Sequence, residues 1–177
     1  MIIKAYPIKH KNNEKLHKDI KNYLKTHPCC KDFPTCLHPR FQTAPGLHHN
    51  FPQLTSSYFD NLKKYLKDIQ PSEDRPEYTV AHFRMWAFIS KEKSTPKYWH
   101  QHALSKANTL EISSLMYLTD TEMGTMFDVK HLKIYLKPQL NTWFFWPSYL
   151  WHSAAITKVS KKDRITIATA IILNPVP

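Results

Sequence analysis

Residues 142–156 read Thr142-Trp143-Phe144-Phe145-Trp146-Pro147-Ser148-Tyr149-Leu150-Trp151-His152-Ser153-Ala154-Ala155-Ile156, with strand-forming runs at 142–147 and 151–156 on either side of a turn. Aromatic and β-branched residues are enriched in strands, and proline and serine are common in turns. Further runs of this character occur at Tyr78–Ser90, Leu110–Thr119, Leu132–Lys137 and Arg164–Leu173. Several strands in succession without helices between them predict a β-sandwich or a barrel.

The first 76 residues differ from the rest of the chain in their predicted secondary structure. Residues 2–8 predict a short edge strand, and apolar residues at helical spacing predict helices over about 13–25 and 56–70. Residues 26–53 are rich in proline and are expected to be irregular, and 71–76 are expected to be a linker. We therefore expect a mainly β fold with N-terminal helices, in which residues 1–76 (strand, helices and proline-rich loop) pack on a β domain at 77–177.

Length and composition limit the class of protein. A chain of 177 residues with 42% hydrophobic and 13% aromatic residues is long enough, and apolar enough, to bury a full core. No apolar run approaches the roughly 20 residues of a membrane helix, and the N-terminus lacks the layout of a secretory signal. Three cysteines, an odd number, fit reduced thiols better than a disulfide framework. We expect a cytoplasmic protein without a membrane partner.

The charge balance is strongly basic. The chain has 25 Lys and Arg against 14 Asp and Glu, a formal net charge of +11. Such a balance suits a nucleic-acid partner. The chain has no arginine-rich tract and no recognisable nucleic-acid-binding motif, however. The charge is therefore interpreted as a solvated, lysine-rich surface, with an anionic small molecule as the ligand.

Three histidines are the candidate metal ligands. His100 and His102 lie two residues apart, so on an extended segment they face the same side, and His152 ends an aromatic strand 50 residues later. A set rich in imidazole suits Fe, Zn, Cu or Ni. The alternative is that an aromatic-rich strand carries ordinary core histidines.

Arg164 and Thr166 share one face of the last long strand, which is otherwise apolar. A guanidinium inside an apolar sheet is costly unless it is paired, and a bound carboxylate would supply the missing counter-charge. The alternative is a salt bridge to Glu111 or to another distant acid. The sequence thus places a candidate anion clamp 12 residues after His152.

Residues 78–174 resemble the Fe(II)- and 2-oxoglutarate-dependent oxygenases, most nearly the prolyl-hydroxylase-like and small 2OG-Fe(II) oxygenase group. The segments that carry the resemblance are Leu115-Met116-Tyr117-Leu118, Met123-Gly124-Thr125-Met126-Phe127, the run from Phe144 to His152, and Arg164-Ile165-Thr166-Ile167. Upstream, Phe41-Gln42-Thr43-Ala44-Pro45-Gly46-Leu47 is similar to a further motif of the group. The resemblance covers a little over half of the chain.

The resemblance implies a double-stranded β-helix, also called a jelly-roll or cupin-like fold, and the roles of five residues. His100 and His152 would bind Fe(II). Arg164 would pair with the far carboxylate of 2-oxoglutarate, helped by Thr166, and Tyr117 is a candidate third contact. Such enzymes use O2 and 2-oxoglutarate and release succinate and carbon dioxide. The expected function is a dioxygenase, most simply a hydroxylase, of a small-molecule or peptidyl substrate.

His102 departs from the pattern of this family, which has a carboxylate in that place. Three neutral imidazoles leave the metal centre about one unit more positive than two imidazoles and a carboxylate. We favour His102 as a ligand. The alternatives are that His102 points away and leaves an open position, or that Glu111 or Asp120 supplies a carboxylate. The departure also motivates a second function, a jelly-roll that binds metal without turnover. A cupin-type metalloenzyme is a third, although Glu111 does not stand at the cupin spacing.

A second cluster of potential ligands lies in the proline-rich segment. Cys29, Cys30 and Cys36, with His27 and His38, have spacings that could close a structural zinc site. Two CxxC knuckles are absent, so an ordinary loop with buried cysteines is the favoured interpretation. Trp99, beside His100, is a candidate for the mouth of the substrate site.

Overall fold

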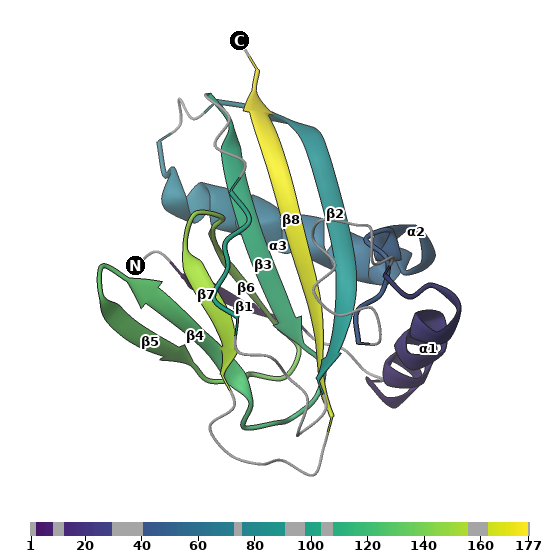
Figure 1. The fold of residues 1–177 in the computed structure, drawn as a ribbon. Helices are drawn as coiled ribbons and strands as arrows, with labels where there is room; N and C mark the ends of the chain where they lie inside the picture. The colour runs from purple at the N-terminus through teal and green to yellow at the C-terminus, as the bar shows by residue number, and fades with distance from the viewer. Residues whose placement is uncertain are drawn as a thin grey trace.

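The computed structural model describes residues 3–8, 13–29, 41–72, 76–90, 98–103, 108–155 and 163–176. Helices and strands follow one another as shown in Figure 1. Their bounds are β1 Lys4–Pro7, α1 Asn13–Thr26, α2 Leu47–Asn50, α3 Pro52–Ile69, β2 Tyr78–Ser90, β3 Leu110–Tyr117, β4 Gly124–Val129, β5 Leu132–Leu136, β6 Thr142–Pro147, β7 Trp151–Ala155 and β8 Arg164–Pro175. Within these ranges, none of the helices combines the length and the apolar character needed to span a membrane.

The strands form two antiparallel sheets. The large sheet has the order β1-β6-β3-β8-β2, and the small sheet has the order β5-β4-β7. The long β8 is hydrogen-bonded to β2 on one side and to β3 on the other. The helices α1 and α3 lie on the far side of the large sheet from the small sheet (Figure 1). The predicted fold class, mainly β with N-terminal helices, is confirmed.

The large sheet is buried on both faces, which explains why its strands are apolar almost throughout. In β6, Trp143 and Phe145 face the helices, whereas Phe144 and Trp146 face the space between the two sheets. Tyr58 of α3 packs against Trp143 and Phe145 with ring centroids 5.4 and 5.5 Å apart. In a sheet that is covered on both faces, the strand sequences are continuously hydrophobic rather than alternating between apolar and polar residues.

Several element boundaries differ from the sequence-based expectation. The helix α3 begins at Pro52 rather than near residue 56, because proline is well suited to the first turn of a helix. A one-turn helix, α2, lies inside the segment predicted to be irregular. The strand β4 was not among the predicted strands, because its glycine and aspartate break the β-type run. The remaining predicted strands agree to within a few residues.

Residues 41–46 run beside β2 and cover its outer edge. Thr43 N donates to Ala87 O at 3.0 Å, Ile89 N to Phe41 O at 2.7 Å, and Met85 N to Pro45 O at 3.1 Å. An uncovered edge strand offers its backbone groups to other chains, so this pairing protects β2. It also places Gln42 beside Phe88 on the inner side of the sheet.

The N-terminal residues contribute directly to the packing of the β region. Strand β1 forms an edge of the large sheet through antiparallel pairs with β6, from Lys4 opposite Phe145 to Pro7 opposite Thr142. The helices share one core cluster with β2, β3, β6 and β8. The division of the chain at residues 76 and 77 stays a prediction.

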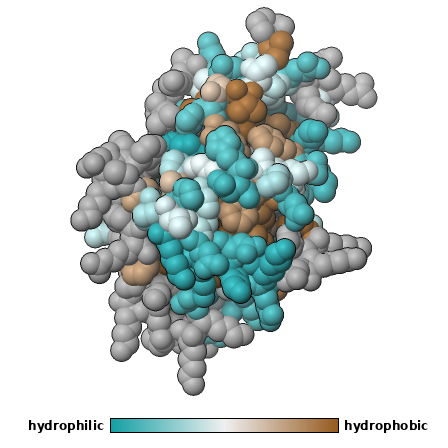
Figure 2. Space-filling view, turned by 90° about the vertical axis from the view of Figure 1, so that its right-hand side faces the viewer, coloured by the Kyte–Doolittle hydropathy of each residue, from teal (hydrophilic) through white to brown (hydrophobic). Residues whose placement is uncertain are grey.

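Figure 2 looks onto the side of the molecule that lies at the right of Figure 1. Hydrophilic side chains gather in the centre of the lower half of this view, at the height of α1. The helix α1 buries Leu16 and Ile20 against the core and exposes lysines such as Lys15 and Lys18 to solvent. This amphipathic pattern is what a helix packed on the outside of a sheet requires.

Candidate metal centre

Three histidine side chains from two segments of the chain meet in one place. His152 lies on β7, and residues 98–103 form an extended segment beside it that carries His100 and His102. His100 N donates to His152 O at 3.0 Å, His152 N donates to His100 O at 2.9 Å, and His102 N donates to Ser148 O at 3.0 Å. This backbone pairing, rather than a loop conformation, fixes where the three rings lie.

The three imidazoles are mutually close. Ring centroids are 4.3 Å apart for His100 and His152, 5.0 Å for His100 and His102, and 5.1 Å for His102 and His152. One nitrogen of each ring lies within 4.8 Å of the corresponding nitrogens of the other two. Among the described residues, this group is composed of histidines alone. The donor set suits a first-row transition metal.

Two of the rings have their tautomer fixed by a backbone carbonyl. His100 Nδ1 donates to Tyr98 O at 3.1 Å, and His152 Nδ1 donates to Leu150 O at 2.9 Å. A carbonyl oxygen can only accept, so the proton resides on Nδ1 in both rings. The lone pair of Nε2 is then available, and a hydrogen-bonded Nδ1 is the usual outer partner of a metal-binding histidine.

Burial keeps these imidazoles in the neutral form. It lowers the pKa of His152 to about 3, with a further contribution from His100. Burial also lowers the pKa of His100. It lowers the pKa of His102 well below the ordinary histidine value, and the electrostatic effects of His152, His100 and Arg84 lower it further. Neutral imidazole is the form that binds metals, so the site is ready for a cation near neutral pH.

Aromatic side chains surround the histidines. Trp86 lies edge-on to His102 with ring centroids 5.6 Å apart, and Trp146 and Phe127 lie 5.2 and 5.8 Å from His152. These rings hold the imidazoles in place and keep the environment apolar. An apolar surrounding strengthens electrostatic interactions inside the site.

A buried guanidinium lies at the other end of the same site. Arg164 is only 4% exposed. Its Nε donates to Met123 O at 2.8 Å, its Nη2 to Thr125 Oγ1 at 3.2 Å, and its Nη1 lies 3.5 Å from Thr166 Oγ1. All of these acceptors are neutral, and no carboxylate in the described part of the chain forms an ion pair with Arg164. The arrangement is suited to a bound anion.

The alternative ion pair between Arg164 and Glu111 is wrong. Glu111 lies opposite Ile172, eight residues from Arg164 along β8. At about 3.3 Å per residue the separation is roughly 25 Å. Neither Glu111 nor Asp120 belongs to the histidine group.

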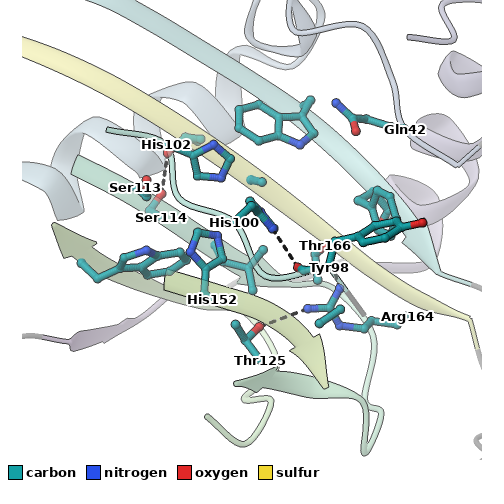
Figure 3. Close-up of a pocket in the computed structure, with 17 residues that line it drawn as sticks. Gln42, Tyr98, His100, His102, Ser113, Ser114, Thr125, His152, Arg164 and Thr166 are labelled. Atoms are coloured by element: carbon teal, nitrogen blue, oxygen red, sulfur yellow. Dashed lines mark hydrogen bonds between the residues drawn. The ribbon is translucent and has the colours of Figure 1, made fainter. Parts of the chain in front are cut away.

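The histidines and Arg164 open onto one cavity of roughly 110 Å³ (Figure 3). Its apolar walls are Trp86, Phe88, Leu115, Trp146, Ala154 and Ala168. Its polar lining residues are Gln42, Tyr98, His100, His102, Ser113, Ser114, Thr125, His152, Arg164, Thr166 and Thr169. The labelled side chains come from both sheets and point toward a common space. This mixture of apolar walls and a few convergent polar groups is typical of a small-molecule site.

The structure brings together most of the residues predicted from sequence. His100, His102, His152, Arg164 and Thr166 all line the cavity. Tyr117 stands behind the cavity wall: it is fully buried, its hydroxyl lies 2.6 Å from Thr125 Oγ1, and the Arg164 guanidinium lies 5.2 Å from its ring centroid. It is therefore a neighbour of Arg164 rather than a residue of the lining.

Sequence reasoning missed six polar lining residues: Gln42, Tyr98, Ser113, Ser114, Thr125 and Thr169. Thr125 and Gln42 are the two for which the sequence carried a signal. Both belong to segments that carry the family resemblance, beside Gly124 and within 41–47, and this was the only available signal. Trp99, considered for the mouth, is 40% exposed and lies under Lys133 Nζ at 4.2 Å, outside the described lining.

The candidate zinc cluster falls mostly outside the described residues. Cys30, Cys36 and His38 lie there. Of the remaining two members, Cys29 is buried, and His27 is exposed and stacks on Tyr23 with ring centroids 4.2 Å apart. The zinc site stays a prediction.

Comparison with known proteins identifies the fold. No protein-family model and no curated protein matches the chain. A prolyl-4-hydroxylase from Pseudomonas putida matches with a TM-score of 0.63 and 8% identity, over 96% of this chain and 92% of that chain. The viral collagen prolyl hydroxylase of Paramecium Bursaria Chlorella virus-1, solved as a 2OG complex, matches with a TM-score of 0.55 and 15% identity, over 99% and 97%.

A non-heme monooxygenase, ThoJ in a nickel complex, matches with a TM-score of 0.64 and 13% identity, over 99% of this chain and 76% of that chain. Identities this low show a common fold and say nothing further about activity. The expected double-stranded β-helix is confirmed, and the chain has structural matches to prolyl 4-hydroxylases across nearly its whole length.

Proposed function

We propose that the chain is an Fe(II)- and 2-oxoglutarate-dependent dioxygenase, most simply a hydroxylase. The observation that carries the proposal is the pairing of two features in one cavity. One is a cluster of three neutral imidazoles, and the other is a buried guanidinium that has no acidic partner among the residues that the structure describes. The first suits a metal ion and the second suits a carboxylate.

His100, His102 and His152 would hold the iron. The available Nε2 atoms of His100 and His152, whose Nδ1 protons are held by backbone carbonyls, support this role. His102 stands where the related enzymes have a carboxylate, and its burial supports a neutral donor at that place. The three histidines would supply three nitrogen donors to the ion, a set that suits iron.

Arg164 would bind the far carboxylate of 2-oxoglutarate. Thr166 and Thr125 lie within reach of its Nη atoms and would offer hydroxyl groups to the same carboxylate. Tyr117 would act through Thr125, since the two hydroxyls share a hydrogen bond. The apolar walls would exclude water from the reacting groups.

When bound, Fe(II) and 2-oxoglutarate would supply an oxidation that consumes O2 and releases succinate and carbon dioxide. The contribution of the chain is to hold these groups and to orient the substrate. The substrate is proposed to be a small molecule or a side chain of a peptide. The aromatic walls and the few convergent polar groups of the cavity support either.

Succinate formation tests the proposal. Purified protein is incubated with Fe(II), ascorbate, O2 and 2-oxoglutarate, and succinate is followed by NMR. We expect slow release of succinate even without substrate, abolished in His152→Gln. The matched control is His82→Gln, because His82 is exposed on β2 and is not among the residues that line the cavity. Absence of succinate under all conditions would contradict the proposal.

A second function is favoured by one observation, the lack of any carboxylate in the described histidine group. A jelly-roll of this kind could bind a metal ion without turnover. Metal binding without succinate formation would support it. Metal binding together with loss of 2-oxoglutarate affinity in Arg164→Met would instead support the dioxygenase.

A further inference from the structure

Arg84 is a second, half-buried arginine, on the cavity-facing side of β2 beside the lining residue Trp86 but outside the lining itself. In β2, Phe83, Met85, Ala87 and Ile89 pack in the core beneath the helices. The alternate residues Trp86 and Phe88 line the cavity. Side chains alternate along a strand, so Arg84 faces the same side as Trp86 and is the next such residue along β2.

Arg84 has no protein partner in the described part of the chain. Its Nε atom is buried and makes no hydrogen bond, and no described carboxylate forms an ion pair with it. Its positive charge helps to lower the pKa of His102, which is consistent with a position beside that ring. A guanidinium that is partly desolvated and unpaired costs free energy unless a ligand supplies the counter-charge.

The charges of the site leave room for a second anion. A divalent metal on three neutral imidazoles, together with two guanidiniums, carries a formal charge of about +4. The two carboxylates of 2-oxoglutarate would offset about half of this charge. The chain as a whole carries a formal net charge of +11, so its long-range electrostatic field also attracts anions.

Arg84 and Arg164 stand at separate places along the large sheet. Arg84 lies opposite Ala170, six residues from Arg164 along β8. At about 3.3 Å per residue this separation is roughly 20 Å between Cα atoms. Trp86, which lies opposite Ala168 and so between these two positions, packs against His102.

We propose that Arg84 binds an oxyanion group of the substrate, a carboxylate or a phosphate, at a separate place along the sheet from Arg164. This inference rests on the proposed function, which makes the cavity an oxidation site. Trp86 and Phe88 would contact the apolar body of the substrate. The Arg84 guanidinium would form two parallel hydrogen bonds to the charged end of the substrate. The substrate class is therefore an anionic molecule, or a peptide with an acidic side chain near the oxidised position.

The test uses three probes of similar shape and different charge: benzoate, phenyl phosphate and benzamide. Each is titrated into 15N-labelled full-length protein, and the Nε–H signal of Arg84 and the indole N–H signal of Trp86 are followed by NMR. We expect benzoate or phenyl phosphate to shift both signals with an affinity at least about tenfold above that of benzamide, because charge-assisted hydrogen bonds to an arginine are involved. The better of the two anions identifies the oxyanion.

Arg84→Gln should lower the affinity for the preferred anion by about tenfold or more, and Arg84→Lys should retain part of it. Equal binding of all three probes, or shifts confined to the signals of Arg164 and Thr125, would overturn the proposal. The comparison of probes on the wild-type chain stands even if Arg84→Gln does not fold.

A separate titration with Mn(II), followed by electron paramagnetic resonance with and without 2-oxoglutarate, tests the metal site. Failure of Mn(II) to bind, with anion shifts at Arg84 intact, would remove the proposed oxidation and leave an anion-binding pocket. Binding of Mn(II) and 2-oxoglutarate without any anion effect at Arg84 would remove the assignment of Arg84 alone.

Discussion

His100 and His152 are held opposite each other by a pair of backbone hydrogen bonds, at 3.0 and 2.9 Å, in which each residue both donates and accepts. Directly opposed residues of antiparallel segments place their side chains on the same face, so the two rings meet at 4.3 Å. The metal centre is thus built by strand pairing. Segment 98–103 lies beside β7 at the edge of the small sheet. The His100–His152 bridge joins this segment to β7.

The first prediction concerns His102. His102→Ala should weaken Fe(II) or Mn(II) binding by at least about tenfold, because a buried nitrogen donor is lost from the group of three. His102→Asp should instead retain binding, since a carboxylate restores the common two-histidine set. Metal affinity is measured by competition with a chelator. His49→Ala, at an exposed position on α2, is the control. Unchanged affinity in His102→Ala would show that His102 is not a ligand.

The sequence predicted most strands and the members of the site because both depend on local pattern. Aromatic and β-branched runs mark β6 and β8, and spacing marks His100, His102 and Arg164. Contacts that depend on the register between paired strands could not be predicted from the sequence. The proximity of Arg84 to His102, and the role of Thr125 as a partner of Arg164, arise only when β2, β4 and β8 are aligned.

The second prediction concerns Gly124, the first residue of β4. A Cβ added there would overlap Leu136 O and would lie 2.7 Å from Tyr135 Cε2. Because the backbone of β5 cannot move away without breaking the pairing, Gly124→Ala should destabilise the fold by about 2 kcal/mol or more. Gly46→Ala is the matched control, since its nearest neighbour would be His49 Cδ2 at 3.4 Å. Chemical denaturation measures the free energy of unfolding of the two variants. Equal values for Gly124→Ala and Gly46→Ala would contradict a steric conflict at Gly124.

The third prediction concerns the turn between β4 and β5. Lys130 and His131 have φ values of 48° and 71°, so both residues of this two-residue hairpin are left-handed. Such turns favour Asn-Gly, because glycine and asparagine tolerate positive φ at low cost. The double substitution Lys130→Asn with His131→Gly should raise the free energy of unfolding by about 0.5–1 kcal/mol. A lower melting temperature would show that these side chains contribute contacts that outweigh backbone strain.

The fourth prediction concerns pH. The folded-state pKa of His152 is lowered to about 3 by burial, whereas the unfolded chain has an ordinary histidine pKa of about 6.5. The unfolded state therefore binds more protons between these values, and stability falls as the pH decreases through this window. For the metal-free protein, His152 alone contributes a loss of up to about 2 kcal/mol between pH 8 and pH 5. Urea denaturation at the two pH values measures it.

In His152→Gln this part of the pH dependence should disappear, whereas His82→Gln, at an exposed position, should leave it intact. An identical slope of stability against pH in wild type and His152→Gln would place the proton uptake elsewhere. Saturation with metal should also reduce the loss at mildly acidic pH, since bound cation and proton compete for the same nitrogens.

The fifth prediction concerns Arg164 and separates the two guanidiniums. Arg164→Met removes the buried donor to which we assign the far carboxylate of 2-oxoglutarate, so cosubstrate affinity should fall by about 100-fold or more. Arg164→Lys should give an intermediate affinity, because an ammonium group cannot reproduce the bidentate geometry. Calorimetric titration of 2-oxoglutarate into the Mn(II)-loaded protein measures these changes. Arg84→Gln is the matched control, since it removes the same charge roughly 20 Å along the sheet and should alter 2-oxoglutarate affinity far less. Should Arg164→Met bind 2-oxoglutarate as the wild type does, a cupin-type metal site without this cosubstrate would become the better interpretation.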